Sequence, residues 1–152
     1  MRVWRVPALD GLELIRATYT AHSFERHAHE TLAVGVIDRG VGRFWCEGSV
    51  HSAQADAVVL IAAGDVHTGG AERPDAPLTY RMFYPSLALV AGFVREASSP
   101  IPRFPRHTCF APGLASHLRA VHDSLQWPGP SRGSDLLASR SPSRGPSRSP
   151  CR

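Results

Sequence analysis

Short apolar runs separated by glycine-containing turns recur along the chain from its start to Pro85. The clearest runs are 31–37 (TLAVGVI) and 57–61 (AVVLI), which are short and rich in β-branched residues, so both are predicted as buried strands. Segments 43–47 and 78–85 alternate around aromatic residues, and 12–19 has the composition of one or two more strands. Strands repeating about every 8–12 residues with turn signals between them predict an all-β sandwich or barrel.

Two turns in this region carry glycine at the position where a positive φ is needed. Residues 38–42 (DRGVG) are predicted as a tight hairpin turn, and Gly48 turns the chain again before residue 51.

The hydrophobic pattern changes after Pro85. Residues 86–97 have apolar positions at helical spacing and predict a short helix, whereas the prolines of 99–105 exclude a helix there. Residues 112–125 predict an amphipathic helix of about three turns. Its apolar face comprises Leu114, Leu118, Val121 and Leu125. That face is a candidate for subunit contact, and the alternative is that it packs back on the strands.

Charge and composition separate the end of the chain from the rest. The chain has 152 residues and a net charge of +4, and all 17 of its basic residues are arginine. Residues 1–127 hold 12 arginines and 12 acidic residues, so 12 − 12 gives no net charge. Segment 128–152 consists mostly of Ser, Arg, Pro and Gly, which predicts disorder. A neutral folded part disfavours nucleic-acid binding by that part.

Several classes of protein are excluded by what the sequence lacks. No apolar run is long enough to cross a membrane and no secretory signal is present, so we expect a cytoplasmic protein. Cys46, Cys109 and Cys151 have no metal-ribbon spacing and are expected to be reduced thiols. The sequence also lacks a nucleophile elbow, a P-loop and a dinucleotide fingerprint.

The strongest candidate for chemistry is a set of three histidines. His27 and His29 alternate along one predicted strand, so their side chains share a face, and His67 follows a Gly-Asp turn much later in the chain. If the barrel closes, these imidazoles can meet in a site suited to a divalent transition metal. The alternative is that they bond backbone carbonyls or line a polar opening.

The motifs together resemble a known family. The runs are His27-Ala28-His29-Glu30, Asp38-Arg39-Gly40, Val59-Leu60-Ile61, Gly64-Asp65-Val66-His67 and Tyr80-Arg81-Met82-Phe83-Tyr84-Pro85. They are similar to the N-terminal effector-binding and dimerisation domain of AraC-type transcription regulators, over about residues 10–125. The resemblance implies a mainly β fold: a small cupin-like β-barrel of the double-stranded β-helix type, followed by one or two helices and the disordered tail.

The resemblance divides the chain into a cupin-like effector-binding barrel (1–97), a helical linker and dimerisation segment (98–127) and the tail (128–152). It implies a small-molecule effector, a homodimer through the C-terminal helix, and no resident cofactor. We expect His27, His29, His67, Trp45 and Tyr80 to bind the effector. A one-residue shift in strand register would reverse the placement of Trp45 and Tyr80.

The chain also departs from the family pattern. Cupin enzymes have a glutamate three to four residues after the paired histidines, where this chain has Leu32 and Ala33, which favours a sensor over an enzyme. The family places two helix-turn-helix units after the helical linker, so we hypothesise that a truncation or frameshift after Trp127 removed the DNA-binding half. The alternative is that 128–152 is a genuine disordered arm whose five arginines contact nucleic acid weakly. The runner-up hypothesis is a stand-alone cupin metalloenzyme that uses the three histidines.

Overall fold

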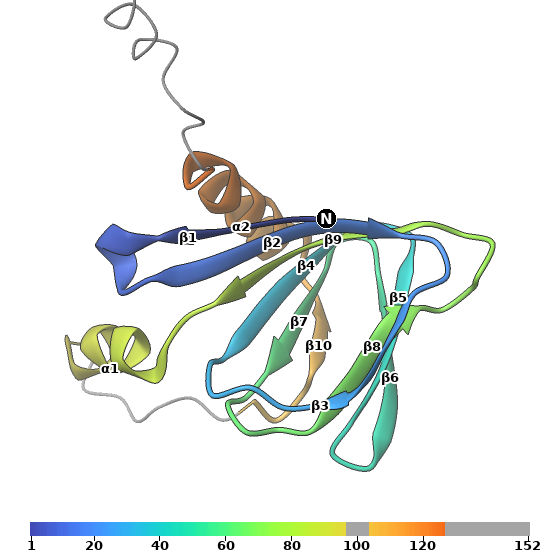
Figure 1. Ribbon diagram of the computed structural model, residues 1–152, viewed down its shortest axis with the longest axis horizontal. Coiled ribbons are helices and arrows are strands. Elements are labelled where there is room, and N and C mark those ends of the chain that lie inside the picture. The colour runs from blue at the N-terminus through green and yellow to red at the C-terminus, as the bar shows by residue number, and fades with distance from the viewer. Residues whose placement is uncertain (97–103, 127–152) are drawn as a thin grey trace, which may run out of the picture.

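Ten strands form two facing antiparallel sheets in the computed structural model, which describes residues 1–96 and 104–126 (Figure 1). The six-stranded sheet has the order β1 (Arg2–Val6), β2 (Leu12–Tyr19), β9 (Leu78–Tyr84), β4 (Ala33–Arg39), β7 (Ala57–Ile61) and β10 (Thr108–Phe110). The four-stranded sheet has the order β3 (Ser23–His27), β8 (His67–Ala71), β5 (Val41–Cys46) and β6 (Ser49–Gln54). The prediction of a mainly β fold with short strands is confirmed.

The two predicted glycine turns have different roles. Residues Glu47 and Gly48 have φ values of 46° and 83° and close a tight β5–β6 hairpin, in which Cys46 pairs with Ser49. Gly40, with φ of 82°, also makes a turn, but β4 and β5 belong to different sheets, so the predicted hairpin there is wrong. The chain instead turns a corner from one sheet to the other. A Cβ at Gly40 would collide with the carbonyl oxygen of Pro77, which explains why glycine is required.

The predicted strand runs supply the core between the sheets. Inward side chains of both sheets form one buried cluster: Ala33, Ile37, Phe44, Cys46, Ala53, Ala57, Val59, Ile61, Leu78 and Met82. Half of them come from the two runs that the sequence identified as buried strands, β4 and β7. Burial of apolar area contributes about 25 cal/mol per Å² to folding, so this cluster supplies much of the stability of the barrel.

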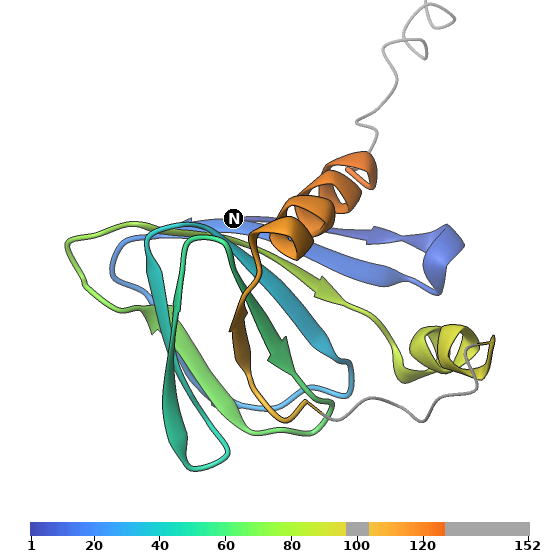
Figure 2. The ribbon, with the colours of Figure 1, turned by 180° about the vertical axis from the view of Figure 1, so that it is seen from behind.

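Two helices follow the last long strand. The predicted helix at 86–97 is α1 (Leu87–Glu96), and the hydroxyl of Ser86 accepts a hydrogen bond from the Leu89 amide at its start. The predicted helix at 112–125 is α2 (Pro112–Ser124). It lies outside the barrel, and Figures 1 and 2 show it beside the six-stranded sheet while α1 stands apart at another edge.

The range 98–127 contributes more than helix. Its strand β10 pairs with β7, Cys109 opposite Val58, and becomes an edge of the six-stranded sheet. A short 3₁₀ turn, Pro7–Leu9, links β1 to β2. The predicted disordered tail, 128–152, lies outside the described residues, and so does the chain around Trp127.

Candidate functional site

The three predicted histidines meet at one end of the four-stranded sheet. His27 ends β3 and pairs with His67, which begins β8, and His29 follows in the next loop. The ring centroids of His27 and His67 are 4.3 Å apart, those of His29 and His67 4.9 Å, and those of His27 and His29 6.3 Å. The pairing of β3 with β8 thus joins two parts of the chain that are distant in sequence.

Each of these imidazoles is held by a backbone carbonyl on its Nδ1 side. Nδ1 of His27 lies 2.7 Å from the carbonyl oxygen of Glu25, Nδ1 of His29 2.8 Å from that of Thr31, and Nδ1 of His67 2.9 Å from that of Asp65. Because a carbonyl can only accept, each Nδ1 carries the hydrogen, and in the neutral form of each ring the lone pair is on Nε2. Nε2 of His29 is buried and has no partner within the described residues.

Burial favours the neutral form of one of these rings, that of His67. The pKa of His67 is lowered from 6.5, first because burial penalises the charged form, and further because His27 and His29 are close. Imidazole in its neutral form is a ligand that zinc and iron accept, and carbonyl bonds to Nδ1 are the usual outer support of such ligands. Their donor chemistry therefore suits a divalent metal, but the ligand atoms of the three rings do not all lie within 4.8 Å of one another in the part of the chain that the structure describes.

A cavity of about 160 Å³ lies between the sheets and reaches His27 and His67. Its walls are mainly aromatic and aliphatic: Ile15, Tyr19, Phe24, Ile37, Phe44, Leu78, Tyr80, Met82 and Tyr84. Burial raises the pKa of Tyr84 to about 12, and it raises the pKa of Tyr80 as well, so both hydroxyls remain protonated at neutral pH. The structure thus places Tyr80 where the sequence expected it, on the cavity wall.

Trp45 does not lie on the cavity wall. Side chains alternate along β5, and Phe44 occupies the inward position, so Trp45 points to the outer surface. There the guanidinium of Arg26 stacks over the indole ring at 4.4 Å from its centroid. The expectation for Trp45 was wrong by one residue of register.

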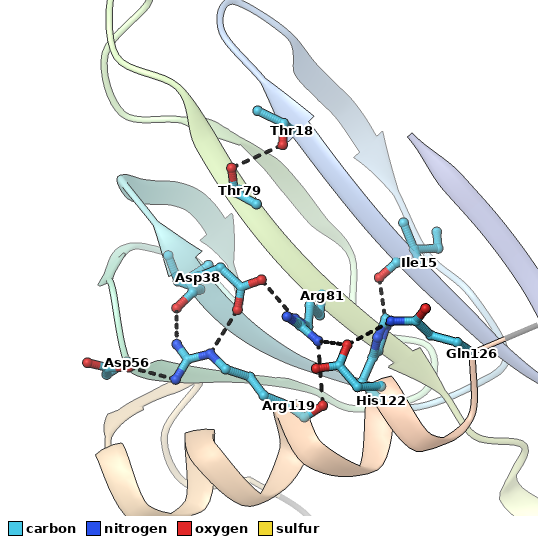
Figure 3. Close-up of polar contacts among 11 residues, drawn as sticks. Ile15, Thr18, Asp38, Asp56, Thr79, Arg81, Arg119, His122 and Gln126 are labelled. Atoms are coloured by element: carbon cyan, nitrogen blue, oxygen red, sulfur yellow. Dashed lines mark hydrogen bonds and ion pairs between the residues drawn. The ribbon is translucent and has the colours of Figure 1, made fainter.

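A buried ion-pair network on the opposite face of the six-stranded sheet was not predicted from the sequence (Figure 3). Arg81 of β9 donates through Nε to Asp38 of β4 at 2.8 Å and through Nη1 to Asp123 of α2 at 2.5 Å. Its side chain is only 8% exposed. The available signal was a single arginine inside the apolar strand 78–85, since such a side chain must find partners if it is buried.

Arg119 of α2 reaches the same carboxylate. It donates through Nε to Asp38 at 2.8 Å and through Nη2 to the Ile37 carbonyl at 2.8 Å, and it pairs with Asp56 at 2.7 Å. Both oxygens of Asp38 are therefore bonded to arginine, one on the sheet and one on the helix (Figure 3). Asp38 was assigned only to a turn by the sequence.

His122 completes the attachment of α2. It is fully buried, its Nε2 lies 3.1 Å from the Ile15 carbonyl oxygen, and its ring packs edge-on against Trp4 and Phe83. The Trp4 indole nitrogen donates to the Leu125 carbonyl at 2.7 Å. Polar and aromatic contacts together fix this helix to β1, β2, β4 and β9.

Residues 11–142 of the chain match the AraC-like ligand binding domain. This chain belongs to that family. The match includes β2 to β10 and α2, so it contains the helix and every residue that lines the cavity except Met1.

Solved structures give the AraC-like domain a cupin-like fold. A cupin-like protein from Thermotoga maritima is 18% identical, with a TM-score of 0.51, over 58% of this chain and 68% of that one. A cupin 2 conserved barrel domain protein from Salinispora arenicola is 19% identical, with a TM-score of 0.48, over 62% of this chain and 83% of that one. The structure from Thermotoga maritima, with a TM-score above 0.5, shows the cupin-like fold of this chain. No curated protein matches the chain significantly.

The predicted contact face of the AraC-like domain is divided by the structure. Leu118 and Leu125 pack against the cluster of Leu12, Leu14 and Phe83 on the outer side of the sheet. Leu114 and Val121 are exposed by 49% and 47%.

The described helices include none long and apolar enough to span a bilayer.

Proposed function

We propose that this AraC-like domain senses a small molecule in its barrel and transmits binding to α2, as the effector-binding and dimerisation part of a transcription regulator. The observation that carries the proposal is that the cavity and the contacts of α2 share the same strands. Family membership and the apolar cavity support the sensing role. DNA contact is left to a helix-turn-helix part of a complete regulator.

The coupling route follows from strand alternation. On β9, Tyr80 and Met82 face the cavity, and Arg81 between them faces α2. On β4, Ile37 lines the cavity while its carbonyl accepts from Arg119. A ligand that shifts either strand must therefore change the contacts of the helix, and it can shift the equilibrium only as far as its preference for one arrangement allows.

Strand β2 repeats the arrangement. Ile15 lines the cavity, and its carbonyl is bonded to the buried His122 of α2. Three neighbouring strands of the sheet thus each offer at least one group to the ligand and one to the helix. Packed elements of this kind respond by changing arrangement as a unit, because the interior is close-packed.

The chemistry of the cavity indicates the class of effector. A volume of about 160 Å³ is close to that of an engineered apolar cavity of roughly 150 Å³ that binds benzene. The nearby histidines present Nε2 lone pairs, which accept hydrogen bonds. The matching effector is a single aromatic ring, or an aliphatic group of its size, that carries a hydrogen-bond donor such as a hydroxyl.

Phenol and benzoate are a matched pair of probes for this class. We expect ligand-observed NMR to show phenol in the cavity and weaker binding of benzoate, whose carboxylate would face lone pairs. Gly69, on the cavity wall, has room for a Cβ at 3.7 Å from Phe24, so Gly69→Leu should narrow the cavity and weaken phenol binding. Trp45→Leu on the outer surface is the control and should bind normally. Equal loss in both variants would refute the assignment of the cavity.

Transmission is tested by hydrogen exchange of the α2 amides with and without phenol. We expect phenol to change α2 exchange in the wild type, and the change to shrink in Arg119→Gln, in which the helix loses its ion pairs with Asp38 and Asp56. Phenol affinity should persist in that variant because Arg119 lies outside the cavity. Unchanged α2 exchange on saturation of the wild type would overturn the coupling.

A second candidate function is a cupin metalloprotein or enzyme that uses His27, His29 and His67. The hydrogen bonds of all three Nδ1 atoms to carbonyls favour it, because they leave every Nε2 available. A bound metal would supply Lewis acidity at the end of the cavity. Metal analysis of purified protein decides: a stoichiometric transition metal that is lost in His27→Ala supports this function, and its absence from the wild type rejects it.

A further inference from the structure

A second group of metal-ligand side chains lies next to the three histidines. Cys46 ends β5, Asp65 lies in the turn before β8, and His107 precedes β10. One ligand atom of each lies within 4.8 Å of the others. Within residues 1–96 and 104–126 this is the one group of three His, Cys, Asp or Glu side chains that converges so closely.

These side chains come from three separate parts of the barrel. Cys46 is fully buried and pairs across the sheet with His67, while His107 is 7% exposed. Asp65 is half-buried. A thiolate, an imidazole and a carboxylate form the mixed sulfur, nitrogen and oxygen donor set that zinc prefers, with a fourth position left for water or another side chain.

The hydrogen bonding of His107 is compatible with a role as a metal ligand. Its Nδ1 lies 3.1 Å from the Leu60 carbonyl oxygen and its Nε2 lies 3.2 Å from a carboxylate oxygen of Glu47. Both neighbours are acceptors, so a neutral ring would direct its remaining lone pair at a carboxylate. The Nδ1 contact with the carbonyl leaves Nε2 as the nitrogen that can bind a metal, and the Glu47 carboxylate beside it adds negative charge to the site.

The local charge also suits a cation. Burial raises the pKa of the Cys46 thiol to about 11, with the negative charges of Asp65 and Glu47 acting in the same direction. The metal-free protein therefore holds a neutral thiol among carboxylates. A divalent ion would lower the pKa of the Cys46 thiol, because it stabilises the thiolate, and the same two carboxylates would attract the ion.

We propose that Cys46, Asp65 and His107 form a zinc-type metal site, separate from the three histidines. Binding forms a metal–sulfur bond as the Cys46 proton leaves to solvent, so affinity should rise with pH. The ion would connect β5, the β7–β8 turn and the start of β10. It would also steady His67, because the Asp65 carbonyl accepts from the Nδ1 of that ring.

Cobalt titration of the full-length, chelator-treated and reduced protein tests this site. A cobalt–thiolate bond gives a sulfur-to-metal charge-transfer absorption in the near ultraviolet, which imidazole ligands alone do not give. We expect the absorption in the wild type and in His27→Ala. Cys109→Ser and Cys151→Ser are matched controls that should keep it, whereas Cys46→Ser should abolish it.

Two further variants guard against misfolding of Cys46→Ser. In the wild type, an Asp65 carboxylate oxygen accepts a hydrogen bond from the Ala62 amide at 3.2 Å. Asp65→Asn keeps an oxygen for this bond but removes the negative charge, so the variant should fold and bind cobalt at least about tenfold more weakly. His107→Gln should weaken binding likewise. The proposal is overturned if the wild type shows no charge-transfer absorption, if Cys46→Ser retains it, or if folded Asp65→Asn and His107→Gln both bind as the wild type does.

Discussion

The substitution Asp38→Asn tests the attachment of α2 to the sheet. The Asp38 side chain is 14% exposed, and its two oxygens accept from Arg81 and Arg119 at 2.8 Å each. Asparagine has nearly the same shape but no charge, and it can offer only one oxygen, so its amide group must face a guanidinium. The change isolates the loss of charge from any change of volume.

The expected cost follows from these contacts. A hydrogen bond to a charged group contributes about 1.5–3 kcal/mol, and removing one partner of a buried ion pair costs about 3–5 kcal/mol. Arg81 keeps Asp123 and Arg119 keeps Asp56, which offsets part of the loss. We therefore expect the free energy of unfolding to fall by about 3 kcal/mol, which corresponds to a drop in Tm of about 10 °C for a domain of this size.

Urea unfolding of wild type and variants measures this loss. The exposed pair Arg73–Asp75, bonded at 2.7 Å, supplies the control: Asp75→Asn should leave the unfolding midpoint unchanged. A double-mutant cycle with Arg119→Gln should give a coupling energy of about 1 kcal/mol or more. An Asp38→Asn protein within about 0.5 kcal/mol of wild type would refute a structural role for the network.

Three other predictions concern a turn, a titration and an interface. Gly40→Ala should destabilise by at least about 1 kcal/mol more than Gly48→Ala in urea unfolding, because both need positive φ but only Gly40 meets a backbone oxygen; equal costs would contradict this. Burial lowers the pKa of His122 below 6.5, so the unfolded chain binds the proton more readily. Stability should be complete above pH 6.5 and fall below it, by up to about 1.4 kcal/mol per pH unit. Chemical unfolding at several pH values measures how steeply the free energy of unfolding depends on pH. This slope should be smaller in His122→Gln than in the wild type, and His67 should account for the slope that remains. An unchanged slope would contradict the role of His122. Leu114→Asp should abolish any dimer seen by sedimentation, whereas Val50→Asp, on exposed β6, should not; the reverse result would place the interface elsewhere.

Much of the candidate site could be predicted from local pattern. The expectation that His27 and His29 alternate along one strand is wrong, because His27 ends β3 and His29 lies in the loop that follows, but the structure still brings both rings close to His67. Trp45 shows the limit of this reasoning. With a period of two, a one-residue difference in register moves a side chain from the cavity to the surface, and flanking residues do not fix that register.

The ion-pair network around Asp38 could not be predicted from local sequence pattern, for another reason. Its members come from β4, β9, α2 and the turn at Asp56, and nothing in the sequence near Arg81 specifies which carboxylates will receive it. The same is true of Cys46, Asp65 and His107, which are widely separated in sequence and meet only because the fold brings together the end of β5, the turn before β8 and the segment before β10.

Local sequence pattern specifies the elements of this AraC-like domain: short buried strands, a late amphipathic helix and a histidine pair with a third partner. These depend on periodicity and turn residues, which act over a few neighbouring positions. Which faces meet is settled by tertiary contacts, because strand order, register and the packing of α2 are fixed by residues distant in sequence. For that reason the cavity wall, the divided face of α2 and the second ligand cluster emerge from the fold alone.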